Sequence, residues 1–141
     1  MDNHTIIFCS MVVTLTTTLG MIITQLTRKT YPCFAYWTIG WGIRSLASLI
    51  YTTLVGNPAT IVLAGCIDSI GVIANNRGVL VFRERHQANT LWEILGAVLR
   101  TSLFGYFTYS HQINDRVMLY SIYHSAYYGW GVATLLTRHT P

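Results

Sequence analysis

The stretch ATIVLAGCIDSIGVIANNRGVLVF, residues 59–82, decides the fold class of this chain. Its only charged residues are Asp68 and Arg77, and the turn signal Gly56-Asn57-Pro58 stands directly before it. A helix needs about 20 predominantly apolar residues to cross the roughly 30 Å hydrocarbon core of a bilayer. The stretch is long and apolar enough for that, and therefore predicts a transmembrane helix.

Four further apolar stretches of similar length flank this one, separated by short polar or turn-forming segments. Short connections imply antiparallel neighbours. Because Arg28 and Lys29 follow the first stretch and no basic segment precedes it, we expect a retained helix there and no signal peptide. The expected fold is all-α: a polytopic membrane protein whose single transmembrane domain, residues 1–141, is a bundle of five helices at about 6–26, 35–55, 59–82, 91–110 and 116–137.

The composition favours lipid as the surroundings of this bundle. Hydrophobic residues make up 52% of the chain and charged residues only 10%, against roughly 25% charged residues in soluble domains. The net charge is +4, but Arg28, Lys29, Arg83, Arg85 and Arg138 lie between or after the apolar stretches, and the basic residues do not gather on one polar face. We therefore expect contact with anionic lipid headgroups and no binding to nucleic acid.

The basic residues also predict the orientation of the bundle. They follow the first, third and fifth stretches: Arg28, Lys29, Arg83, Arg85 and Arg138. The opposite ends carry Asp2, an uncharged turn and the pair Asp115 and Arg116. The positive-inside rule then places the N-terminus outside and the C-terminus in the cytoplasm.

An intramembrane ion pair is expected between Arg44 and Asp68. Counted from Asn57 at 1.5 Å per residue, the two side chains lie at depths of roughly 20 and 17 Å in adjacent antiparallel helices. Our preferred interpretation is that the pair locks the second helix against the third, because breaking a buried pair is costly. The alternative is a switch that responds to a proton or a ligand.

Two other polar groups fall within the helices. An inner-end cluster comprises Asn75, Asn76, Arg77 and Glu93. Arg77 and Glu93 have suitable positions for a pair, and we favour a solvated or interfacial role for it. The second group is Arg100 with a stripe on the fifth helix at i, i+3, i+4 and i+7 spacing: Tyr120, Tyr123, His124 and Tyr127. We expect this stripe to face protein as a hydrogen-bonded polar core.

No cofactor is expected, although bound lipid is. A haem with two histidine ligands needs a second histidine at the depth of His124, which only a symmetric dimer would supply. The three cysteines, Cys9, Cys33 and Cys66, have no metal-ligand spacing and fall at different depths, so we expect neither a metal site nor an intramolecular disulfide.

From Arg28 to about Thr137 the chain resembles the N-terminal membrane region of bacterial GGDEF-domain diguanylate cyclases. The matching features are Tyr31-Pro32 before YWTIG at 36–40, the turn at 56–58, IVLAG at 61–65, and NRG at 76–78 before FRER at 82–85. The resemblance implies a signal-input module in the bacterial cytoplasmic membrane. The GGDEF signature itself is absent, so cyclase activity does not carry over, and Arg44 and Asp68 have no counterpart in the family pattern.

We expect a protein that is not an enzyme, because the sequence has no nucleophile and base pair, no phosphate loop and no metal-ligand spacing. The favoured function is signal input through a partner. The alternative is an accessory subunit of a larger membrane complex, of the respiratory, photosynthetic or transport kind, and a small oligomeric transporter ranks third. The expected partners are the lipid bilayer and either other membrane subunits or a second copy of the chain.

Overall fold

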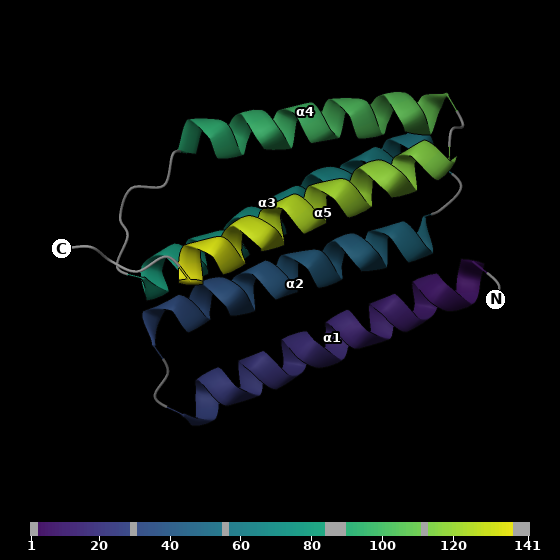
Figure 1. The fold of residues 1–141 in the computed structure, drawn as a ribbon. Coiled ribbons are helices and arrows are strands. Elements are labelled where there is room, and N and C mark those ends of the chain that lie inside the picture. Colours follow the sequence, from purple (N-terminus) through teal and green to yellow (C-terminus); the bar gives the residue numbers. More distant parts are fainter. Residues whose placement is uncertain (1–2, 29–30, 55–56, 84–89, 111–112, 137–141) are drawn as a thin grey trace.

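The computed structural model describes residues 3–28, 31–54, 57–83, 90–110 and 113–136. Within these residues the regular structure is entirely helical, without strands, which confirms the all-α prediction and the number of helices. The five helices are α1 (Asn3–Thr27), α2 (Pro32–Thr53), α3 (Pro58–Phe82), α4 (Thr90–Tyr109) and α5 (Ile113–Leu136). They lie side by side, so that α1 begins at one end of the bundle and α5 ends at the other (Figure 1).

Proline and a capping residue determine where helices α2 and α3 begin more than the start of each apolar stretch does. Helix α2 begins at Pro32, earlier than the expected start at 35, and proline stands in the first turn of both α2 and α3. Proline suits the first helical position because its missing N–H would have no partner there. Helix α3 also has a cap, since the side chain of Asn57 accepts a hydrogen bond of 2.9 Å from Ala59 N. Residues 55 and 137, the expected ends of two helices, lie outside the described residues.

Helix α3 is the centre of the bundle. It packs against α2, α4 and α5, whereas α1 packs against α2 alone. Figure 1 shows α1 and α4 at opposite edges, with α2, α3 and α5 between them. Within the described helices, α2 makes no close backbone contact with α4 or α5. Among the described residues, α2 is therefore linked to α4 and α5 through side chains and not through close backbone packing.

Glycines bring α2 and α3 into backbone contact. A Cβ atom on Gly40 would lie 2.8 Å from the carbonyl oxygen of Gly71, and one on Gly71 would lie 2.8 Å from that of Gly40. Gly78 is one heptad after Gly71 on the same face of α3, and a Cβ there would lie 3.1 Å from the carbonyl oxygen of Cys33. Larger side chains at these positions would force the two helices apart.

Polar and apolar residues are distributed in the reverse of the usual order. The buried side chains include more polar or charged residues than apolar ones, with Asp68, Asn76 and Arg100 among them. Large apolar side chains cover the outside instead; Leu19 and Leu99, for example, are 59% and 62% exposed. A soluble domain buries its large apolar residues and leaves most charged ones in water.

By length and composition, α3 is the one described helix that qualifies to cross a membrane; an apolar part of α1, Met11–Thr27, is shorter. The sequence predicted five such helices from the lengths of the apolar stretches, and the composition of the other four described helices does not support that number. Helix α5, for example, is interrupted by Asp115, Arg116 and His124.

Candidate functional site

The centre of the site is the carboxylate of Asp68, which one cationic or imidazole side chain from each of three other helices approaches. Arg44 Nε on α2 lies 3.1 Å from Oδ1, Arg100 Nη2 on α4 lies 2.9 Å from Oδ2, and His124 Nε2 on α5 lies 3.2 Å from Oδ2. The exposed fractions of these four side chains lie between 2% and 11%. We call Asp68, Arg44, Arg100 and His124 the Asp68 cluster.

Arg44 is held by more than the carboxylate. Its Nη1 donates to the hydroxyl of Tyr128, its Nη2 lies 3.5 Å from the hydroxyl of Tyr120, and its Cζ lies 5.0 Å from the centre of the Trp41 ring. The structure thus brings together Arg44 and Asp68, the pair expected from their depths. The two tyrosines extend the contact from α2 and α3 to α5.

Arg100 is almost fully buried and makes contacts with α3 and α5. Its Nη1 donates to the carbonyl oxygen of Gly65 at 3.1 Å and to the Ser69 hydroxyl. Its Cζ lies 4.6 Å from the centre of the Tyr123 ring and 5.3 Å from that of Tyr120, within cation–π range. The expected neighbourhood of Arg100 and the tyrosine stripe is therefore present.

The first residues of the stripe on α5 contact one another, whereas Tyr127 at its end contacts a different part of the bundle. Tyr120 stacks on His124 with ring centres 4.0 Å apart, and His124 Nδ1 lies 2.9 Å from the Tyr120 carbonyl oxygen. The other ring nitrogen, Nε2, is the one that faces Asp68. Tyr127 instead donates to the carbonyl oxygen of Glu93 at 3.3 Å, outside the Asp68 cluster.

The residues predicted as one inner-end cluster take different directions. Arg77 Nη2 and Glu93 Oε2 form a pair at 2.6 Å, with side chains 29% and 11% exposed. The Glu93 carboxylate is therefore covered by protein more than a solvated role implies. Asn75 Oδ1 points at Gly40 on α2, whereas Asn76 Oδ1 lies on the side of Gly131 on α5. Successive residues of a helix point about 100° apart, so these two amides cannot share one neighbour.

Sequence reasoning missed that the Arg44 pair and the Arg100 group share one carboxylate. It also missed Tyr128, although Tyr120, His124 and Tyr128 repeat at i, i+4 and i+8, so extending the stripe by one turn would have found it. The residues thus form a single network across four helices, α2 to α5.

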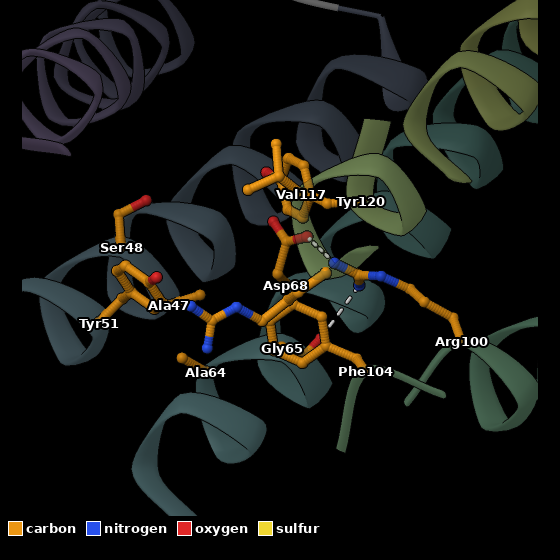
Figure 2. A pocket seen from close by; sticks show the side chains of 11 residues that line it. Ala47, Ser48, Tyr51, Ala64, Gly65, Asp68, Arg100, Phe104, Val117 and Tyr120 are labelled. Carbon is orange, nitrogen blue, oxygen red and sulfur yellow. Dashed lines mark hydrogen bonds and ion pairs between the residues drawn. The ribbon is translucent and has the colours of Figure 1, made fainter. Parts of the chain in front are cut away.

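A cavity of about 330 Å³ opens beside the cluster, between α2, α3, α4 and α5. Figure 2 shows Asp68 and Arg100 joined at one side of it, with Phe104 nearby. Apolar side chains form most of the remaining wall, and Arg116 also lines it. The full lining is Ala47, Ser48, Tyr51, Ala64, Gly65, Asp68, Arg100, Phe104, Arg116, Val117 and Tyr120.

The charges around this cavity do not balance. The guanidinium groups of Arg44 and Arg100 share a single carboxylate, and Arg116 has no ion-pair partner among the described residues. A buried charge without a counter-ion is costly, so excess positive charge in a covered site favours an anion. The arrangement is suited to binding a negatively charged group.

No metal centre emerges from the part of the chain that the structure describes. No three His, Cys, Asp or Glu side chains there come close enough together to hold an ion. Cys9 is exposed, Cys33 is buried and Cys66 lies between these extremes, and all three are free thiols.

A scan against protein-family models, a search of curated proteins and a search of solved structures each found no match to this chain.

Proposed function

We propose that this chain is a non-catalytic integral membrane protein that acts as a signal-input module through a partner. In this proposal all five helices cross the bacterial cytoplasmic membrane, with the N-terminus outside and the C-terminus inside. The module resembles the membrane region of GGDEF-domain diguanylate cyclases.

The reversed distribution of side chains supports the membrane setting. Large apolar residues point outward along the helices, as Ile23 and Val98 do at 60% and 57% exposure, while the charged cluster is enclosed. In lipid, apolar side chains are solvated on the outside and polar ones must find partners inside the bundle. A charged cluster at the centre of a bundle with an apolar exterior satisfies both conditions.

The single observation that carries the signalling role is the convergence of three helices on the Asp68 carboxylate. Arg44, Arg100 and His124 belong to α2, α4 and α5, and the backbone of α2 makes no close contact with that of α4 or α5. A ligand that competes for one of these side chains changes the contacts of Asp68 with several helices at once. Differential binding of this kind is what shifts a bundle between two arrangements.

A second candidate function is an accessory subunit of a larger membrane complex. Helix α1 favours it, because α1 packs only against α2 and leaves apolar side chains such as Leu19 and Ile23 on its open face. The same face also suits lipid, so partner association must be measured directly.

Native mass spectrometry of the protein, extracted from its own membranes in mild detergent, tests the proposal. A signal-input module predicts association or continuity with a cytoplasmic output domain. A fixed stoichiometric assembly with respiratory, photosynthetic or transport subunits, and no output domain, would reject signal input in favour of the accessory role. The 15.9 kDa mass of the chain makes each partner easy to resolve.

A further inference from the structure

We infer that the cavity beside Asp68 binds a small amphiphilic anion, with its carboxylate or phosphate oxygens at Arg116 and Arg100 and its apolar body against Phe104 and Val117. This inference names a ligand class for the proposed signal-input module. It rests on that proposal only for the membrane setting.

The polar side of the cavity has donors to spare. Arg116 lines the cavity without an acidic partner among the described residues, and its Cζ lies 6.0 Å from the centre of the Phe104 ring. Arg100 also lines the cavity, and its Nη atoms bind Asp68, Ser69 and Gly65; its Nε atom is enclosed by protein and is not counted among the donors that a ligand reaches. Guanidinium groups match the oxygen geometry of carboxylates and phosphates.

Asp68 does not cancel this preference, although its carboxylate also lines the cavity. Oδ1 is bound by Arg44, and Oδ2 is bound by Arg100 with His124 Nε2 at 3.2 Å. Counting Arg44, Arg100 and Arg116 against Asp68 leaves an excess of two positive charges. An incoming anion therefore meets a positive site in which the single carboxylate is already neutralised.

The remaining wall requires an apolar body on the ligand. Ala47, Ala64, Phe104 and Val117 offer carbon surface, and the volume of about 330 Å³ falls at the lower end of the range for small-molecule sites. A fully hydrated inorganic anion would leave this surface without a contact. A carboxylate or phosphate attached to a short aliphatic or aromatic group fills both parts of the site.

The cavity is lined in part by a side chain at the outer surface of the bundle. Val117 on α5 belongs to the lining and is 59% exposed, so the cavity has an opening beside it. In a membrane this opening faces lipid, so the anion has two possible sources. One is a free amphiphilic acid dissolved in the bilayer, and the other is the headgroup of an anionic phospholipid.

The test uses the purified full chain in nanodiscs of phosphatidylcholine, with empty nanodiscs as the partitioning control. The probes are 4-phenylbutyrate and its neutral counterpart 4-phenylbutanamide, and binding is read by isothermal titration calorimetry. We expect the acid to bind and the amide to bind at least about tenfold more weakly, as for loss of a charge-assisted hydrogen bond. Equal binding of acid and amide, or no binding beyond empty nanodiscs, would overturn the inference.

Matched variants locate the site. Arg116→Gln removes the unpaired guanidinium and should weaken 4-phenylbutyrate by about tenfold or more, whereas Arg28→Gln removes an arginine beyond the end of α1 and should leave binding unchanged. Ser48→Leu fills the cavity and should abolish binding, whereas Ser121→Leu, at an exposed position of α5, should not. Equal losses within either pair would contradict the assigned site.

Nanodiscs that also contain phosphatidylglycerol separate the two sources. A loss of 4-phenylbutyrate binding that exceeds the loss of partitioning into empty nanodiscs of the same lipid mixture identifies the anionic headgroup as the competing occupant, and a loss no larger than that identifies a free acid. The outcome is independent of the proposed function. A protein that carries an output domain yet binds no probe rejects the anion site alone, and a probe-binding protein found only in a fixed accessory assembly rejects signal input alone.

Discussion

Arg44 and Arg100 bind opposite oxygens of the same carboxylate, although α2 and α4, which carry them, do not pack against each other. Arg44 Nε is 3.1 Å from Asp68 Oδ1, and Arg100 Nη2 is 2.9 Å from Oδ2. Oδ1 thus faces α2, whereas Oδ2 faces α4 and also lies 3.2 Å from His124 Nε2 on α5. One side chain of α3 therefore contacts three neighbouring helices, so a change at Asp68 affects all three contacts.

The contact between α2 and α3 should tolerate no added methyl group. Gly40→Ala and Gly71→Ala each place a Cβ 2.8 Å from a backbone oxygen, so we expect each to destabilise the protein by about 1–3 kcal/mol. Gly20→Ala is the control, because a Cβ there meets nothing within 4 Å and alanine favours a helix by up to about 1 kcal/mol. Unfolding by denaturing detergent measures both effects, and equal effects of Gly40→Ala and Gly20→Ala would contradict the close approach.

The pair at the inner end should matter less than the Asp68 cluster. Glu93→Gln weakens the contact with Arg77, whose side chain is 29% exposed and keeps access to solvent. We expect a loss of about 1 kcal/mol, measured by the same unfolding assay. Asp115→Asn, which neutralises an exposed carboxylate in the first turn of α5, is the control and should cost less. A Glu93→Gln loss as large as that of Asp68→Ala would show that the inner pair is the main lock.

The proposed topology predicts which positions a membrane-impermeant thiol reagent can reach. In a background without native cysteines, Asn57→Cys should be labelled in intact cells, because the α2–α3 turn is placed outside. Arg28→Cys, in the turn after α1, should be labelled only after the membrane is opened. Labelling of Arg28→Cys alone in intact cells would show the opposite orientation, and equal labelling of both positions would show that α2 does not cross the membrane.

How much the sequence could predict depends on which helices a contact joins. Arg44 and Asp68 flank one turn, so their depths can be counted from Asn57 and their pairing follows. Arg100 and His124 likewise flank the turn between α4 and α5. Their contact with Asp68 depends on how α3 packs against α4 and α5. Counting residues from the turn that joins two consecutive helices cannot predict this packing.

Apolar stretches predicted the helices themselves but not their ends or their inner faces. Residues 113–115 belong to α5 although they are polar in part, because Asp115 suits the first turn of a helix. The directions of Asn75 and Asn76 were not predictable for a similar reason. Both lie on α3, which packs against α2, α4 and α5. A polar residue in the sequence of α3 therefore does not reveal which of these helices its side chain faces.

The most direct test of the central claim, that Asp68 joins α2 and α4 to α3, is a pair of double-mutant cycles. They combine Asp68→Ala with Arg44→Met and with Arg100→Met, and detergent unfolding is the readout. Asp68→Ala alone should cost about 3–5 kcal/mol, because it leaves two buried guanidinium groups without a counter-charge. Each double mutant should recover only part of that loss, since the other arginine stays unpaired, with coupling energies of at least about 1 kcal/mol in both cycles. Additive single-mutant effects in either cycle would show that the carboxylate does not join that helix to α3, and the account would be wrong.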